Sequence, residues 1–271
     1  MIGTVTRPAY VLTVIVAGLA ALAAAGGLLL ENMYRDNAFT VSTWSGNDLA
    51  TLFVMVPLLI GALVSASRGS TCGYLVWLAL VDAMLYNYAF YLFGAAFNWL
   101  FPVYAAIFAC AIWAFFLGLT NLNVVALKAR FSRRTPVRWI SAWMLFVGLG
   151  LGMVYIAQWA AFALGAAVPA IMARTEQHTN VVFALDLSLV IPLLVVGAVW
   201  LWRRKPWGYA IAAIINLKGA VYMVGLCAST YTAYQAGTIA NLGELPIWAF
   251  IGAGCLVASV ALLHNLNGAE Y

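Results

Sequence analysis

Charged residues are scarce in this chain. Of its 271 residues only 8% are Asp, Glu, Lys or Arg, whereas 66% are hydrophobic, and the mean hydropathy is +0.99. A soluble fold of this length could not bury so much apolar surface. A nucleic-acid partner is not expected either, because most of the 13 Lys and Arg lie in short loops rather than on one soluble face. The composition therefore predicts an integral membrane protein.

Residues for metal binding and common hydrolytic chemistry are also few. The chain has two histidines, and its four cysteines show no C-x-x-C spacing, so neither a metal centre nor a redox motif is indicated. No G-x-S-x-G, H-E-x-x-H or phosphate-binding loop occurs in a suitable context. We therefore predict no catalytic residues, no metal and no cofactor. A noncatalytic protein is favoured, and a membrane enzyme built on Asp and Tyr stays open.

Eight apolar segments are long enough to cross a bilayer, which takes about 20 residues of helix. They are residues 9–30, 48–66, 72–97, 99–122, 138–164, 182–202, 206–232 and 246–266. With their connections they use the whole chain, so no soluble domain is expected. The alanine-rich end of the first segment is also typical of a signal peptide, but its apolar run continues to Leu30, so we expect it to remain a span.

Basic residues occupy alternate connections between these segments. One set contains Arg7, Arg68, the cluster at 128–138 and residues 203–205, and the other set contains only Arg35 and Arg174. By the positive-inside rule, both termini are expected to be cytoplasmic, in a plasma membrane of the bacterial inner-membrane type. The lipid bilayer is the expected partner, and a small-molecule ligand and an oligomer are left open.

The two halves of the chain share a pattern. The run VPLLIGALV around Pro57 matches IPLLVVGAV around Pro192, and a Gly-Tyr pair follows each at the same offset, at 73–74 and 208–209. Such a recurrence indicates an internal repeat. Because each half has an even number of segments, both halves would insert the same way up.

The predicted fold is therefore an all-α polytopic membrane protein. Its eight transmembrane helices would form two tandem, parallel-oriented four-helix repeats. The first unit would comprise residues 1–122 and the second residues 138–271, joined by a basic cytoplasmic linker at 123–137.

Two charged residues fall in the middle of apolar segments. Asp82 and Lys218 lie nine and ten residues after the glycine of their Gly-Tyr pairs, so both should come close to the midplane. An unpaired charge at that depth costs on the order of 3 kcal/mol, so we expect the two to pair. A tyrosine follows each at i+4, on the same helix face, and asparagines lie nearby. The candidate ligand-binding set is Asp82, Tyr86, Asn87, Asn216, Lys218 and Tyr222.

A second pair of carboxylates, Asp48 and Asp186, is expected near the external ends of the second and sixth helices. A carboxylate at a helix N-terminus caps open amide groups and complements the helix dipole, which is the favoured interpretation. The alternative is an external vestibule acid that serves a cation or a proton. Their distances to Pro57 and Pro192 differ by three residues, so the two are not strict equivalents.

Three functional classes are compatible with these residues. Duplicated units with charges at midplane match the organisation of secondary transporters, so a carrier of a small solute or lipophilic molecule, with a polar site between the repeats, is favoured. The first alternative is a noncatalytic membrane assembly or accessory protein in which Asp82 and Lys218 form a structural pair. The second is a ligand-binding membrane protein or a lipid-modifying membrane enzyme.

A resemblance to microbial rhodopsins is confined to two residues. Lys218 in the seventh helix and Asp82 in the third are similar to the lysine that carries a retinal Schiff base and to its counter-ion. The resemblance would imply a retinal-binding protein. Here an eighth helix follows, the repeat explains the same residues, and the sixth helix has no matching aromatic pocket motif, so this stays a minor alternative.

Overall fold

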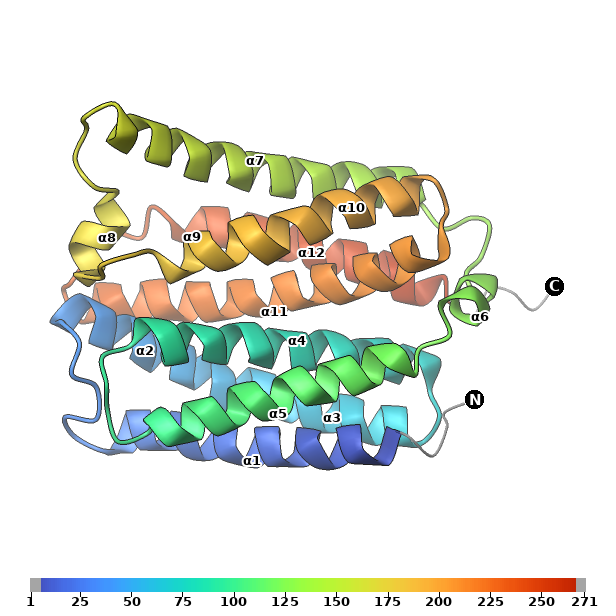
Figure 1. Cartoon of the computed structure of the whole chain (residues 1–271), viewed down its shortest axis with the longest axis horizontal. Coiled ribbons are helices and arrows are strands. Elements are labelled where there is room, and N and C mark those ends of the chain that lie inside the picture. Colours follow the sequence, from blue (N-terminus) through green and yellow to red (C-terminus); the bar gives the residue numbers. More distant parts are fainter. Residues whose placement is uncertain (1–5, 267–271) are drawn as a thin grey trace.

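The computed structural model describes residues 6–266, and these form a bundle of helices (Figure 1). Helix makes up 80% of the structure, and the described residues contain no strand. Within the described residues, eight helices are long and apolar enough to cross a membrane. The prediction of an all-helical, multi-pass membrane protein is confirmed.

The eight spans follow one another along the chain with short connections. The first span is α1 (Thr6–Leu29). The second is a continuous rod made of α2 (Ala38–Ala50), η1 (Thr51–Met55) and α3 (Val56–Ser67). The third and fourth are α4 (Thr71–Gly94) and α5 (Phe101–Thr120). The fifth span is α7 (Val137–Ala163). The sixth is a second rod made of α9 (Val181–Leu185), η2 (Asp186–Val190) and α10 (Ile191–Trp202). The seventh and eighth are α11 (Pro206–Gln235) and α12 (Leu245–His264). Two short helices, α6 (Val124–Ala129) and α8 (Ala170–Thr175), lie in connections.

The second span begins ten residues earlier than the sequence predicted. The side chain of Asn37 accepts a hydrogen bond from the backbone N–H of Thr40 at 2.9 Å and so caps the helix start. Residues 38–47 look polar in the sequence, but the hydroxyl groups of Ser42, Thr43 and Ser45 donate to backbone carbonyls of their own helix, and α11 contributes further hydrogen bonds. Thr232 of α11, for example, donates to the carbonyl oxygen of Ser42 at 2.7 Å. The predicted connection at 31–47 is therefore mostly helix.

The two halves of the chain lie side by side, and α4 and α11 run along their boundary (Figure 1). One buried apolar cluster comes mainly from α1 to α5 and a second mainly from α7, α10, α11 and α12. Helices α1 and α7 both begin at the end that holds the connections 68–70, 121–136 and 203–205, which we call the basic end. The first spans of the two halves, α1 and α7, thus run in the same direction.

A wide helical turn precedes a proline in both interrupted spans. In η1 the N–H of Val56 bonds the carbonyl of Thr51, and in η2 the N–H of Ile191 bonds the carbonyl of Asp186. These i to i−5 bonds define π-helical turns. In a regular α-helix the ring of the following proline, Pro57 or Pro192, would collide with the carbonyl four residues earlier, and the wider turn gives it room.

The Gly-Tyr pairs allow close helix hairpins at the basic end. A Cβ atom on Gly73 would lie 2.6 Å from the Cβ of Ser65, and one on Gly208 would lie 2.6 Å from the Cα of Leu201. Both separations are far below a normal carbon contact. Glycine is therefore required for α3 to approach α4 and for α10 to approach α11.

Candidate functional site

Asp82 of α4 and Lys218 of α11 meet where the two halves of the bundle touch. The Nζ atom of Lys218 lies 3.5 Å from Oδ2 of Asp82, and the side chains are 8% and 13% exposed, respectively. The ion pair expected from their matching depths is present. Whether these residues bind a ligand stays a prediction.

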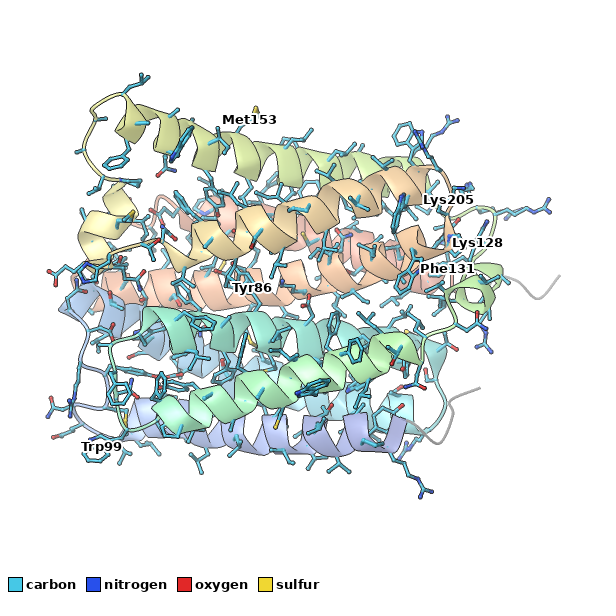
Figure 2. The ribbon with its side chains drawn as sticks, viewed as in Figure 1. Tyr86, Trp99, Lys128, Phe131, Met153 and Lys205 are labelled. Atoms are coloured by element: carbon cyan, nitrogen blue, oxygen red, sulfur yellow. The ribbon has the colours of Figure 1, made fainter. Side chains whose placement is uncertain are left out.

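Tyr86 connects this ion pair to a third charged residue. Its ring centroid lies 4.2 Å from Nζ of Lys218, which is a cation–π distance. Its hydroxyl donates a hydrogen bond to Oδ1 of Asp186 at 2.8 Å. The ring of Tyr222 packs edge-on against it, with centroids 4.9 Å apart. Figure 2 shows Tyr86 at the boundary between the two halves.

Asp186 belongs to this central site rather than to a helix end. Asn180 caps α9, where its side chain accepts from the N–H of Phe183 at 3.1 Å, and Asp186 begins the wide turn inside the span. The second oxygen of Asp186, Oδ2, accepts from the hydroxyl of Tyr155 on α7 at 2.8 Å. The residue is 5% exposed. The interpretation of Asp186 as an N-terminal cap is therefore wrong.

The same correction applies to Asp48. It lies eleven residues after the cap Asn37 and is 2% exposed. Its Oδ2 accepts from the hydroxyl of Tyr34 at 2.5 Å, and its Oδ1 accepts from the hydroxyl of Tyr91 at 2.7 Å. Neither Asp48 nor Asp186 lies on an open surface of the bundle, and their role as vestibule acids for a cation or proton stays a prediction.

Asn87 joins the cluster around Asp48 rather than the ion pair. Its Oδ1 accepts from Nδ2 of Asn47 at 2.8 Å, and its own Nδ2 donates to Oγ1 of Thr51 at 3.3 Å. Asn47 also donates to the hydroxyl of Tyr91 at 3.0 Å. The first half thus holds its own buried polar cluster beside its wide turn.

Asn216 stands apart from both clusters. It lies two residues before Lys218, about 200° around the helix, so the two side chains leave α11 in different directions. Its Nδ2 donates to the carbonyl of Ala212 in its own helix at 2.8 Å, and the residue is 1% exposed. None of its described hydrogen bonds leads to the ion pair.

A cavity of about 520 Å³ opens at the end of the bundle opposite the basic end. Tyr34 and Asp36 are among its lining residues, and Tyr34 is also the residue whose hydroxyl donates to Asp48. Burial raises the pKa of Tyr34 far above its usual value, and the nearby Asp48 carboxylate adds to the shift, so its hydroxyl stays a donor. Burial likewise raises the pKa of Asp36.

Three tyrosines and one asparagine of these clusters could not be assigned from the sequence: Tyr34, Asn47, Tyr91 and Tyr155. Tyr34 lies in a connection, and Tyr155 comes from a helix whose sequence carries no charge near it. The available signal was the presence of buried carboxylates, which require hydroxyl or amide donors, but nothing in the sequence indicates which donors they find.

The bundle as a whole defines an integral, multi-pass membrane protein, because its eight apolar helices require contact with a lipid bilayer. Comparison with protein-family models, with curated proteins and with solved structures finds no match. Within residues 6–266, no group of three or more His, Cys, Asp or Glu could hold a metal ion. The chemistry of the site must therefore be inferred from its own geometry.

Proposed function

We propose that this protein is a membrane carrier for a small solute, with a polar binding site between its two halves that couples movement to a proton or a small cation. The site comprises Asp82, Tyr86, Tyr155, Asp186, Lys218 and Tyr222. The observation that carries the proposal is the unequal number of charges. Two carboxylates lie around one ammonium group, that of Lys218: Asp82 pairs with it at 3.5 Å, and Asp186 accepts a hydrogen bond from Tyr86, whose ring faces the same ammonium group.

A purely structural ion pair needs only one carboxylate for each ammonium group. The second carboxylate, Asp186, leaves one negative charge without a partner when all three groups are ionised. An uncompensated charge inside a bilayer is costly and is balanced by a bound proton or cation. A buried group that must take up and release such an ion is what a coupling site requires.

The proposed carrier consists of two parallel repeats, residues 1–122 and 138–271. Thr51 and Asp186 both begin a wide turn, and each lies six residues before the matching proline. Asn87 and Tyr222 both lie fourteen residues after the glycine of the Gly-Tyr pair. Two pairs of equivalent positions thus carry polar groups of the two clusters, and the carrier is proposed to work by rocking of the two halves about the central site.

The ion pair is closed, with most of both side chains buried, so the carrier is proposed to be in an occluded form. With both termini in the cytoplasm of a bacterial-type inner membrane, the cavity beside Tyr34 would face the outside. Movement of Tyr34 would then expose Asp48 to the solution. Tyr34 is accordingly the proposed outer gate of the carrier.

Replacing Asp186 by asparagine should abolish coupled transport while keeping the fold, because the amide oxygen can still accept a hydrogen bond from Tyr86 or Tyr155. The measurement uses proteoliposomes that contain a pH-sensitive dye and are exposed to a membrane potential and to a panel of small amines and amino acids. We expect the unmodified protein to move protons when its solute is added. Asp186→Asn should reduce this flux at least tenfold.

The matched control is Glu244→Gln, which removes an exposed carboxylate and should leave the flux unchanged. If the unmodified protein moves neither protons nor any solute of the panel, the carrier proposal fails. If Asp186→Asn transports as well as the unmodified protein, coupling at Asp186 is wrong.

A second candidate function is a noncatalytic assembly protein in which the Asp82–Lys218 pair only fastens the two halves together. The closed contact, with 13% of Asp82 and 8% of Lys218 exposed, favours it. This candidate predicts strong energetic coupling between the two residues in folding and no flux in proteoliposomes. The assembly candidate does not explain the extra carboxylate of Asp186.

A further inference from the structure

A cavity of about 360 Å³ opens at the basic end, far from the central site. It lies between the start of α7 and the end of α10, and its lining residues are Thr135, Pro136, Val137, Arg138, Trp202 and Arg204. Two of these are arginines, and no acidic residue lines the cavity. Figure 2 shows other basic side chains, Lys128 and Lys205, at the same end.

Arg204 occupies a backbone position that favours glycine. Its φ is +51°, in the left-handed region that is unfavourable for a residue with a side chain. The matching position in the first half is Gly69, with φ +87°, and each residue lies twelve after its proline. The same turn is thus made by glycine in one half and by arginine in the other, so the arginine side chain is retained at an energetic cost.

The guanidinium group of Arg204 is held in place before any ligand arrives. Nη1 donates to the hydroxyl of Tyr209 at 3.2 Å, and Nη2 donates to the carbonyl of Arg133 at 3.2 Å. These two bonds fix the direction of the side chain and leave its remaining N–H donors for an anion. Because the guanidinium group is already fixed in direction, it loses little conformational entropy when it binds an anion.

The surroundings of the cavity fit the membrane surface. Trp202 lines it and is 50% exposed, and Trp139, next to Arg138, is 47% exposed. Tryptophans of this kind lie at the level of the lipid headgroups. Below Trp202 along α10, Val196 and Val199 present exposed apolar side chains where acyl chains would run.

We propose that this cavity is a binding site for the headgroup of an anionic phospholipid. The phosphate lies between Arg138 and Arg204, which offer charge-assisted hydrogen bonds, and the acyl chains follow the exposed face of α10. A lipid rather than a soluble phosphate is the occupant, because the arginines adjoin exposed tryptophans and lipid-facing valines. This site is independent of the proposed carrier function.

The decisive variant is Arg204→Gly, because it places at this turn the residue that the first half already uses. It should leave thermal stability unchanged or raised, so a loss of lipid cannot be attributed to misfolding. Binding is measured by native mass spectrometry of the detergent-purified full chain with added phosphatidylglycerol or phosphatidylcholine. We expect the unmodified protein to favour phosphatidylglycerol about tenfold, and Arg204→Gly to bind it at least tenfold more weakly.

Arg138→Gln should weaken binding similarly, whereas Arg68→Gln, a basic residue in another connection of the same end, should have no effect. Equal binding of the two lipids by the unmodified protein, or full binding by Arg204→Gly, would overturn the proposal. If millimolar inorganic phosphate displaces the lipid, the site is one for soluble phosphate and the lipid assignment is wrong.

Discussion

Replacing Lys218 by methionine should lower the free energy of unfolding by roughly 3–5 kcal/mol, the cost of removing one partner from a buried ion pair. The change leaves two carboxylates, Asp82 and Asp186, without a cation in the middle of the bundle. It also removes the ammonium group from the face of the Tyr86 ring. This variant should therefore be the most damaging of those at the central site.

Asp82→Asn should be milder, by about 1–3 kcal/mol, because Lys218 keeps the negative charge of Asp186 and the ring of Tyr86 nearby. The double variant Asp82→Asn with Lys218→Met should be more stable than Lys218→Met alone, since it leaves one buried carboxylate instead of two. This ordering distinguishes a three-charge site from a simple pair, in which the two single variants would be similar.

These stabilities can be measured by titrating the purified protein from mild detergent micelles into SDS and following helix content. Lys205→Met, which removes an exposed lysine at the basic end, is the control and should stay within about 0.5 kcal/mol of the unmodified protein. Strictly additive effects of the two single variants would show that Asp82 and Lys218 do not interact energetically.

Gly46→Ala is expected to weaken the contact between the two halves by at least about 3 kcal/mol, above the usual range for overpacking. A Cβ atom at this position of α2 would lie 2.5 Å from the backbone carbonyl carbon and oxygen of Ala228 on α11. Backbone atoms of a helix cannot turn aside as a flexible side chain can. The whole of α2 would have to move away from α11, and the hydrogen bond from Thr232 to Ser42 would be lost.

Gly18→Ala and Gly61→Ala are the matched controls, because a Cβ atom at either position would meet nothing within 4 Å. Both should gain up to about 1 kcal/mol from the better helix propensity of alanine. The three variants can be compared by thermal unfolding in the same detergent. A Gly46→Ala protein as stable as its controls would contradict the close packing of α2 on α11.

The spans and the central ion pair could be predicted because the signals for them are local in the sequence. A run of about 20 apolar residues and the cost of a charge inside it require no knowledge of neighbouring helices. The matching depths of Asp82 and Lys218 then indicated their contact.

The start of the second span and the position of Asp186 could not be predicted, because both depend on contacts between distant residues. The polar residues of α2 are covered by α11, about 190 residues later, from which Thr232 donates to the backbone carbonyl of Ser42. Asp186 was expected to cap its helix because it lies close to the predicted amino-terminal end of the sixth segment. The actual cap is Asn180, and the five residues of α9 between them place Asp186 inside the bundle.

The wide turns ahead of Pro57 and Pro192 have a mechanical consequence. Each holds one residue more than an ordinary turn, so tightening it to α-helical pitch would rotate the preceding rod by about 100° about its own axis. In the second half, this rotation of α9 and η2 would move Asp186 out of reach of Tyr86, and the span would stay helical. A tightened turn would also press the ring of Pro57 or Pro192 against the carbonyl four residues earlier, so the prolines hold each rod in the orientation that keeps its buried acid on its tyrosine partners.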